Sequence, residues 1–189
     1  MGGSSILALP YADGIAADRF LSDFGYRLRD ANVAIAGLVQ RNTFVRDRTK
    51  CDMEFEELSS GNILRLSENR GAGARGCRLD RGVLSAAAAM LLQILEADRK
   101  PGLLILNKFG KIEAEGAGLR DVIASALGME IPVIVGVPFR NLDQWRAFAG
   151  EFAEEGAFDD QSLDAWLERC NIVACRIHRG KPSGITAVR

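Results

Sequence analysis

Two short apolar runs with a helical pattern between them constrain the fold of this chain more than any other feature. Leu103–Leu106 and Val133–Val137 are too short for helices and are bounded by Gly, Pro or charged residues. Such runs are typical of strands that are buried on both faces. Residues 117–127, between them, have the spacing of an amphipathic helix. Together they predict the βαβ unit of a parallel sheet, with a right-handed crossover.

The same alternation continues along the rest of the chain. Further strands are expected at Ser4–Leu9, Val33–Val39 and Ile172–Ile177, and further helices at Ile15–Ala31, Asp80–Asp98, after Pro138 and at Ser162–Cys170. No repeat or low-complexity linker divides the chain. We therefore expect one α/β domain over residues 1–189, with a mostly parallel sheet and helices on both faces.

Residues 40–80 have a different composition and are expected to form an insertion. Met53–Glu57 and Asn62–Leu66, on either side of a Ser-Ser-Gly turn, predict an antiparallel hairpin. The following segment, 68–78, is rich in Gly and Arg. It fits either a solvated loop or an anion-binding loop that uses Arg70 and Arg78. The tail at 179–189 is expected to be loose.

Composition limits the class of partner. The 189 residues have 48% hydrophobic content and a formal net charge of -1, which gives no general attraction to nucleic acid or to acidic membranes. The longest apolar stretch, Val83–Leu95, is too short to span a bilayer, and no signal peptide is evident. A cytoplasmic protein is expected. The four cysteines form no CxxC pair and only one histidine is present, so no metal site is predicted.

Polar groups are concentrated in residues 107–116, directly after the strand at Leu103–Leu106. Ligands of open parallel sheets bind beyond the carboxyl ends of strands, so this segment contains the first candidates for a binding site. They are Asn107, Lys108, Lys111, Glu113 and Glu115. The two carboxylates fit acid–base chemistry, cation binding or simple stabilisation of a helix N-terminus. Salt bridges to the lysines are equally compatible with their spacing.

Several segments carry a resemblance to known proteins. Gly37, the hairpin sequence CDMEFEELSSGN, the Gly110-Lys111-Ile112-Glu113 segment and the PVIVGV run at 132–137 resemble the small P-loop nucleoside triphosphatases first described from thermophiles. Over most of its length the chain is also similar to a bacterial family with a domain of unknown function, often encoded beside molybdate-transport genes. That second resemblance lies in residues 37–40, 79–80, 107–111 and 113–116. Both imply a three-layer P-loop NTPase-like fold.

The chain departs from the P-loop pattern at both of its chemical motifs. In the segment 10–18 only Gly14 remains of the phosphate-binding glycines, and the resemblance places Ala17 at the Lys position and Asp18 at the Ser/Thr position. Asn107 and Lys108 stand where the Walker B pair, Asp and Glu, would hold magnesium and orient water. These changes argue against ordinary ATP or GTP hydrolysis. Asp13, Gly14 and Asp18 remain ligand-binding candidates.

Three functions are compatible with these residues. The first is a non-hydrolytic binding or regulatory protein for a nucleotide or an oxyanion such as molybdate, linked to molybdenum metabolism through the resemblance. Magnesium and nucleotide are then possible cofactors that no intact motif supports. The second is a divergent nucleoside triphosphatase or phosphotransferase that uses Asp13, Asp18, Lys108 and Glu113. The third is a partner-binding module or homo-oligomer whose interface is formed by the hairpin together with Trp145 or Trp166, if these tryptophans are exposed instead of packed in the core.

Overall fold

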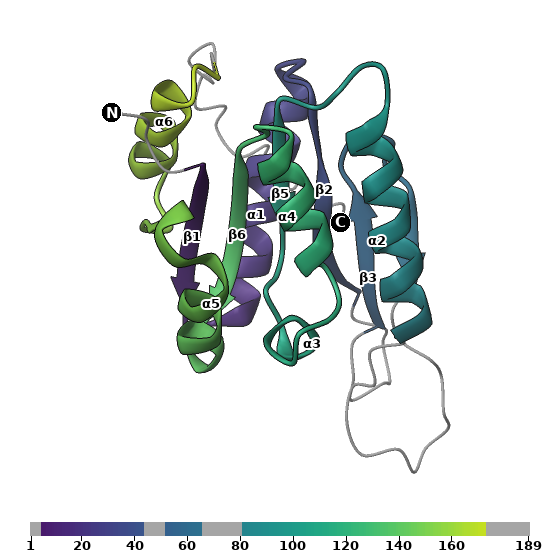
Figure 1. The fold of residues 1–189 in the computed structure, drawn as a ribbon. Helices are drawn as coiled ribbons and strands as arrows, with labels where there is room; N and C mark the ends of the chain where they lie inside the picture. The colour runs from purple at the N-terminus through teal and green to yellow at the C-terminus, as the bar shows by residue number, and fades with distance from the viewer. Residues whose placement is uncertain (1–4, 44–51, 66–80, 173–189) are drawn as a thin grey trace, which may run out of the picture.

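The computed structural model describes residues 5–43, 52–65 and 81–172, which form a seven-stranded sheet in the order β4-β3-β2-β5-β6-β1-β7 (Figure 1). The sheet is parallel across β2, β5, β6, β1 and β7. Strand β3 pairs antiparallel with β2, and β4 pairs antiparallel with β3. The strand bounds are β1 (Ile6–Tyr11), β2 (Ile35–Thr43), β3 (Asp52–Glu57), β4 (Ile63–Arg65), β5 (Leu103–Leu106), β6 (Val133–Pro138) and β7 (Ala153–Glu155). The predicted α/β class and mostly parallel sheet are confirmed.

Helices cover both faces of the sheet, as predicted (Figure 1). One face packs against α2, α4 and α5, and the other packs against α1 and α6. The helix bounds are α1 (Gly14–Asp30), α2 (Arg81–Glu96), α3 (Lys111–Ala114), α4 (Arg120–Gly128), α5 (Leu142–Ala149) and α6 (Asp160–Arg169), with 3₁₀ turns η1 (Phe139–Asn141) and η2 (Gly150–Phe152). No helix of the described ranges is long and apolar enough to cross a membrane.

The apolar runs of the central strands fill the core. All four residues of β5 and all six of β6 are buried. In β1, Ile6 and Ala8 face the α2–α4–α5 side while Leu7 and Leu9 face the α1–α6 side. This two-sided burial explains why these strands read as continuous apolar runs instead of alternating patterns.

A glycine permits β2 to approach β5 closely. Gly37 has φ +145°, and a Cβ atom there would lie 1.9 Å from the backbone oxygen of Ile105. Gly37 pairs with Ile105 in the parallel ladder, and its carbonyl accepts a hydrogen bond from Leu58 N–H at 2.9 Å. Any side chain at this position would therefore push β2 and β5 apart.

Two acidic residues fasten the hairpin to the rest of the sheet. Glu57 is fully buried, and its carboxylate accepts hydrogen bonds from the backbone and side chains of Ser59 and Ser60. Glu56 accepts from Tyr26 Oη at 2.8 Å and from Arg29 at 3.0 Å, which ties the hairpin to α1. Burial alone would raise the pKa of Glu56, but these hydrogen bonds hold it below its usual value. Burial and the bond to Glu56 raise the pKa of Tyr26 to about 12.

Several sequence predictions differ from the structure. Strand β7 was not predicted, and α4 starts at Arg120 instead of near residue 117. Trp145 and Trp166 are each 1% exposed, so the predicted alternative of a partner surface built on these tryptophans is wrong, because both side chains pack in the core. The Arg/Gly-rich segment with Arg70 and Arg78, the loose tail and most of the strand predicted at Ile172–Ile177 lie outside the described residues.

We predict that Gly37→Ala lowers the free energy of unfolding by about 3 kcal/mol, because the new Cβ must displace backbone and adopt an unfavourable φ. The measurement is urea denaturation followed by circular dichroism. Gly128→Ala is the matched control, since nothing lies within 4 Å of a Cβ at that position. Equal losses in the two variants would contradict the close-approach argument.

Candidate functional site

Strand β1 and helix α1 are joined by only Ala12 and Asp13 at the carboxyl edge of the sheet. Asp13 is the N-cap of α1, and its carboxylate oxygen Oδ1 accepts hydrogen bonds from Ile15 N–H at 2.9 Å and Ala16 N–H at 3.2 Å. Amides in the first turn of a helix are the usual binding groups for phosphate. In this chain a carboxylate of the protein itself takes that place.

A hydrogen bond joins α1 to the end of β5. Asn107 Nδ2 donates to Asp18 Oδ1 at 2.7 Å, although the two residues are 89 positions apart in the sequence. Asn107 is fully buried and Asp18 is 6% exposed. By the resemblance, these two positions correspond to the residues that hold magnesium in P-loop nucleoside triphosphatases. Here they are a carboxylate and a carboxamide that form a hydrogen bond.

Tyr11 and Asn107 approach each other over Gly136. A Cβ atom at Gly136 would lie 3.4 Å from Asn107 Oδ1 and 3.4 Å from the Tyr11 ring, so the absence of a side chain creates this meeting point. The Tyr11 hydroxyl and Asn107 Oδ1 are buried and have no hydrogen-bond partner among the residues that the structure describes. Burial and the nearby charge of Asp18 raise the pKa of Tyr11, while Arg140 acts in the opposite direction.

The loops that follow β5 and β6 are tied together. Phe109 N–H donates to the Gly136 carbonyl at 2.9 Å, and Asn141 Nδ2 donates to the Phe109 carbonyl at 3.1 Å. Lys108 and Arg140 extend from these two loops. Neither cation forms an ion pair within the described part of the chain. The two loops thus place two positive charges at one edge of the sheet.

Glu113 shapes the loop between β5 and α4. It is 3% exposed, and its two oxygens accept hydrogen bonds from Gly110 N–H at 2.8 Å and Leu119 N–H at 3.0 Å. Its carboxylate is thus engaged by backbone at both ends of the loop. Lys111 and Glu115, in contrast, are exposed and paired with each other at 3.6 Å, and Glu115 also pairs with Arg81 at 3.5 Å.

Of the predicted site residues, Asp13, Gly14, Asp18, Asn107 and Lys108 lie at the carboxyl edge. Sequence reasoning missed Tyr11, Gly136 and Arg140. Ligands bind beyond the carboxyl ends of parallel strands, and we used this rule only for the loop after β5. The same rule, used for the loop after β6, would have identified Arg140. Across the described residues, no group of three or more His, Cys, Asp or Glu side chains could hold a metal ion.

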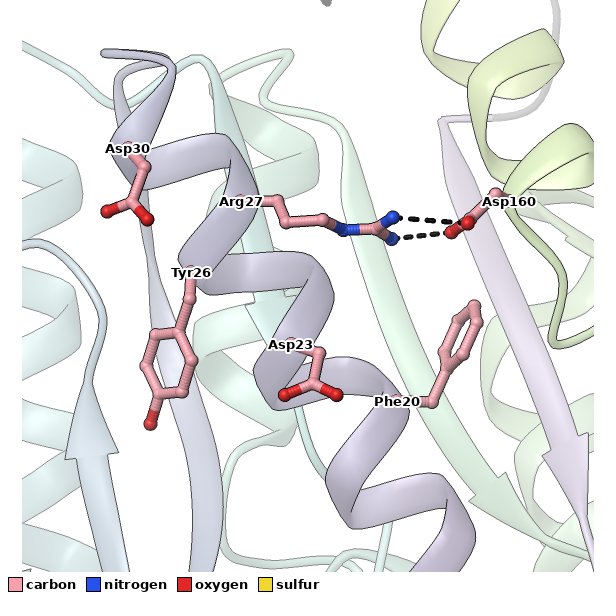
Figure 2. Close-up of a pocket in the computed structure, with 6 residues that line it drawn as sticks. All are labelled: Phe20, Asp23, Tyr26, Arg27, Asp30 and Asp160. Atoms are coloured by element: carbon pink, nitrogen blue, oxygen red, sulfur yellow. Dashed lines mark hydrogen bonds and ion pairs between the residues drawn. The ribbon is translucent and has the colours of Figure 1, made fainter. Parts of the chain in front are cut away.

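A separate hollow of about 460 Å³ lies between α1 and α6 (Figure 2). Phe20, Asp23, Tyr26, Arg27, Asp30 and Asp160 line it. The guanidinium of Arg27 binds both carboxylate oxygens of Asp160 across one side of the hollow, and Asp23 pairs with Arg19 at 3.7 Å. The lining therefore has three carboxylates and one cation that is already paired, which does not suit an anionic ligand.

A family model described as "Protein of unknown function (DUF2478)" matches residues 6–166. The chain belongs to the DUF2478 family. This DUF2478 chain is also 32% identical over 163 residues to a "Molybdenum import ATP-binding protein ModC 2" of Bradyrhizobium diazoefficiens. The match covers 85% of the chain but 18% of that relative, so the chain corresponds to less than a fifth of the relative's length.

A solved structure shows the fold family of this DUF2478 chain. The solution structure of a human cancer-related nucleoside triphosphatase superposes with a TM-score of 0.57 at 15% sequence identity, covering 93% of this chain and 98% of that chain. The fold is therefore P-loop NTPase-like, as the sequence resemblance implied. At this level of identity the likeness shows the fold alone.

We predict that Asp13→Ala lowers the free energy of unfolding by about 1 kcal/mol, because it removes the cap of α1. Asp13→Ser keeps a capping oxygen and should retain most of the stability. Urea denaturation of the three proteins measures the difference. If Ser and Ala are equally destabilising, capping is not the main role of Asp13.

The pH dependence of stability should report on Glu113. Burial raises the pKa of its carboxyl, and the N–H groups of Leu119 and Gly110 and the charge of Lys108 offset this only in part. A raised folded-state pKa contributes stability that is present below the unfolded value and is lost as the pH rises through the folded value. The unfolding free energy of the wild type minus that of Glu113→Gln should therefore fall as the pH rises above the ordinary carboxyl range, and it should level off once the folded-state carboxyl has ionised. A difference that is constant or rises with pH would show that burial in the folded protein does not raise the pKa of Glu113.

Proposed function

We propose that this protein is a non-hydrolytic binding or regulatory protein of molybdenum metabolism. Its ligand is a small anion, either a nucleotide or an oxyanion, which binds at the carboxyl edge of the sheet. The observation that carries the proposal is the hydrogen bond between Asp18 and Asn107. These two residues occupy the positions that hold magnesium in P-loop nucleoside triphosphatases.

The residues present do not fit a magnesium–nucleotide complex of the P-loop kind. Such a complex needs a hydroxyl on the helix and a carboxylate on the strand as metal supports, together with a lysine on the phosphates. Here the helix supplies Ala17 and Asp18 and the strand supplies Asn107. The first-turn amides of α1 that would face phosphate are engaged by Asp13.

A divergent hydrolase built on other acidic groups is less well supported by the same contacts. Asp13 is engaged as a helix cap and Glu113 as a double acceptor for backbone N–H groups. A general base needs a lone pair directed at the reacting proton. Glu113 directs both oxygens at backbone amides instead, and Asp13 directs Oδ1 at the amides of Ile15 and Ala16.

Lys108 and Arg140 support the binding of an anion. They lie on adjacent loops held together by the hydrogen bonds of Phe109 with Gly136 and Asn141. Because the backbone that carries the two cations is already fixed, only their side chains have to be ordered when they bind a shared ligand. Beyond the carboxyl ends of parallel strands is also the usual position of ligands in this class of sheet.

The link to molybdenum metabolism rests on a relative. A protein whose name describes molybdenum import and ATP binding includes a segment 32% identical to this chain. Because that segment is 18% of the relative, the named activity can belong to the rest of it. A domain carried by such a protein would suit a regulatory or sensing role for the same process.

We predict that Lys108→Ala and Arg140→Ala each weaken binding of the best ligand among ATP, GTP and molybdate about tenfold, because each removes a charge-assisted contact. Isothermal titration calorimetry on the full chain measures this. Lys100→Ala is the matched control, since Lys100 is exposed but precedes β5 at the opposite edge. Phosphate release from ATP or GTP with magnesium should equal the blank without protein.

Two results would contradict the proposal. Absence of heat with all three ligands at high protein concentration would exclude the binding function. Phosphate release that disappears in Lys108→Ala would show that the site hydrolyses nucleotide.

A further inference from the structure

Two large apolar side chains are exposed at the carboxyl edge. Phe139, directly after β6, is 57% exposed, and Ile15, in the first turn of α1, is 66% exposed. Phe139 is the neighbour of Arg140 in the 3₁₀ turn η1. An exposed aromatic ring beside an unpaired cation is a common arrangement for binding a planar, negatively charged compound.

The helix N-terminus at this edge offers few free backbone N–H groups to a bare oxyanion. A compact dianion such as molybdate requires several N–H or O–H donors, but the Ile15 and Ala16 amides already donate to Asp13. Asn107 Oδ1, which has no partner in residues 5–43, 52–65 and 81–172, can only accept hydrogen bonds. The carboxylates of Asp13 and Asp18 also offset the charges of Lys108 and Arg140.

We propose that the ligand is a phosphorylated heteroaromatic compound, whose ring packs on Phe139 and whose phosphate is bound by Arg140 and Lys108. This inference rests on the proposed function and specifies its ligand class. The ring supplies binding free energy that the balanced charges at this edge do not. The phosphate faces the loops after β5 and β6 instead of the N-terminus of α1.

Hydrogen bonding of the 3₁₀ turn η1 fixes the backbone that carries Phe139 and Arg140 next to the loop that carries Lys108. Asn141, the last residue of η1, donates its side-chain N–H to the Phe109 carbonyl, and Phe109 itself is fully buried against Trp145 at 5.1 Å between ring centroids. Phe139 and Arg140 precede Asn141, and Lys108 precedes Phe109. The backbone segments that carry Phe139, Arg140 and Lys108 are therefore joined to each other and to the core, and the three side chains extend from them.

The test is calorimetric titration of the full chain with GMP, AMP, inorganic phosphate and molybdate. GMP or AMP should bind more tightly than either inorganic anion. Phe139→Ala should weaken nucleotide binding about 5- to 150-fold, the range that base stacking on an aromatic side chain provides. The same substitution should leave any binding of inorganic phosphate unchanged.

Phe152→Ala is the matched control. Phe152 is 59% exposed, close to the value for Phe139, but it precedes Ala153, which pairs with Ile6 at the amino end of β1. This variant should bind nucleotide as the wild type does. Circular dichroism should show that both variants are folded.

The outcomes separate the two proposals. Binding of molybdate or phosphate at least as tightly as GMP and AMP, or nucleotide binding unaffected by Phe139→Ala, would overturn this inference and leave an anion site in place. Equal weakening by Phe152→Ala would also overturn it. If none of the four compounds binds, this inference fails, and the proposed function fails with it only when ATP and GTP also give no heat.

Discussion

Burial of the central strands on both faces is the constraint on which the rest of this structure depends. With α1 and α6 on one side and α2, α4 and α5 on the other, β5 and β6 have no exposed residue. Polar side chains cannot be accommodated along such strands without losing hydrogen bonds to water. They are therefore gathered where strands end, which is why Tyr11, Asn107 and Arg140 come together although they are distant in the sequence.

At that edge, side chains of the protein form hydrogen bonds with several groups that a P-loop would offer to a ligand. Asp13 accepts from the first-turn amides of α1, and Asn107 donates to Asp18. Both interactions stabilise the connection between the helix and the sheet while reducing what remains for a phosphate. In the described part of the chain, the groups at this edge that remain available to a ligand include the cations Lys108 and Arg140 and the exposed ring of Phe139.

The long-range arrangement was predictable where local patterns were strong. The apolar runs at β5 and β6 and the helical spacing in α1 each have a single physical explanation, so the βαβ units could be identified from sequence. Strand β7 could not be, because Ala153-Glu154-Glu155 has no apolar pattern and is a strand only through its pairing with β1. Helix α3 is one turn long and depends on Glu113 contacts that span the loop.

The site was only partly predictable for a related reason. The position of a loop after a buried strand identifies Asn107 and Lys108, since that inference needs only neighbouring residues. The bond between Asp18 and Asn107 and the meeting of Tyr11 with Asn107 over Gly136 depend on strand order, which the sequence patterns do not specify. The occupation of the α1 amides by Asp13 depends on where the helix begins.

The two-residue connection between β1 and α1 sets a limit on how this chain relates to catalytic members of its fold. A phosphate-binding loop of the GxxxxGK[ST] type needs a longer series of residues between strand and helix than Ala12 and Asp13 supply. All positions of the segment 10–18 are present in this chain, but α1 already begins at Gly14, and Asp13 accepts hydrogen bonds from its first amides. Exchange of Ala17, Asp18, Asn107 and Lys108 for the missing motif residues would therefore not by itself create a phosphate site, because the helix would also have to begin later in the chain.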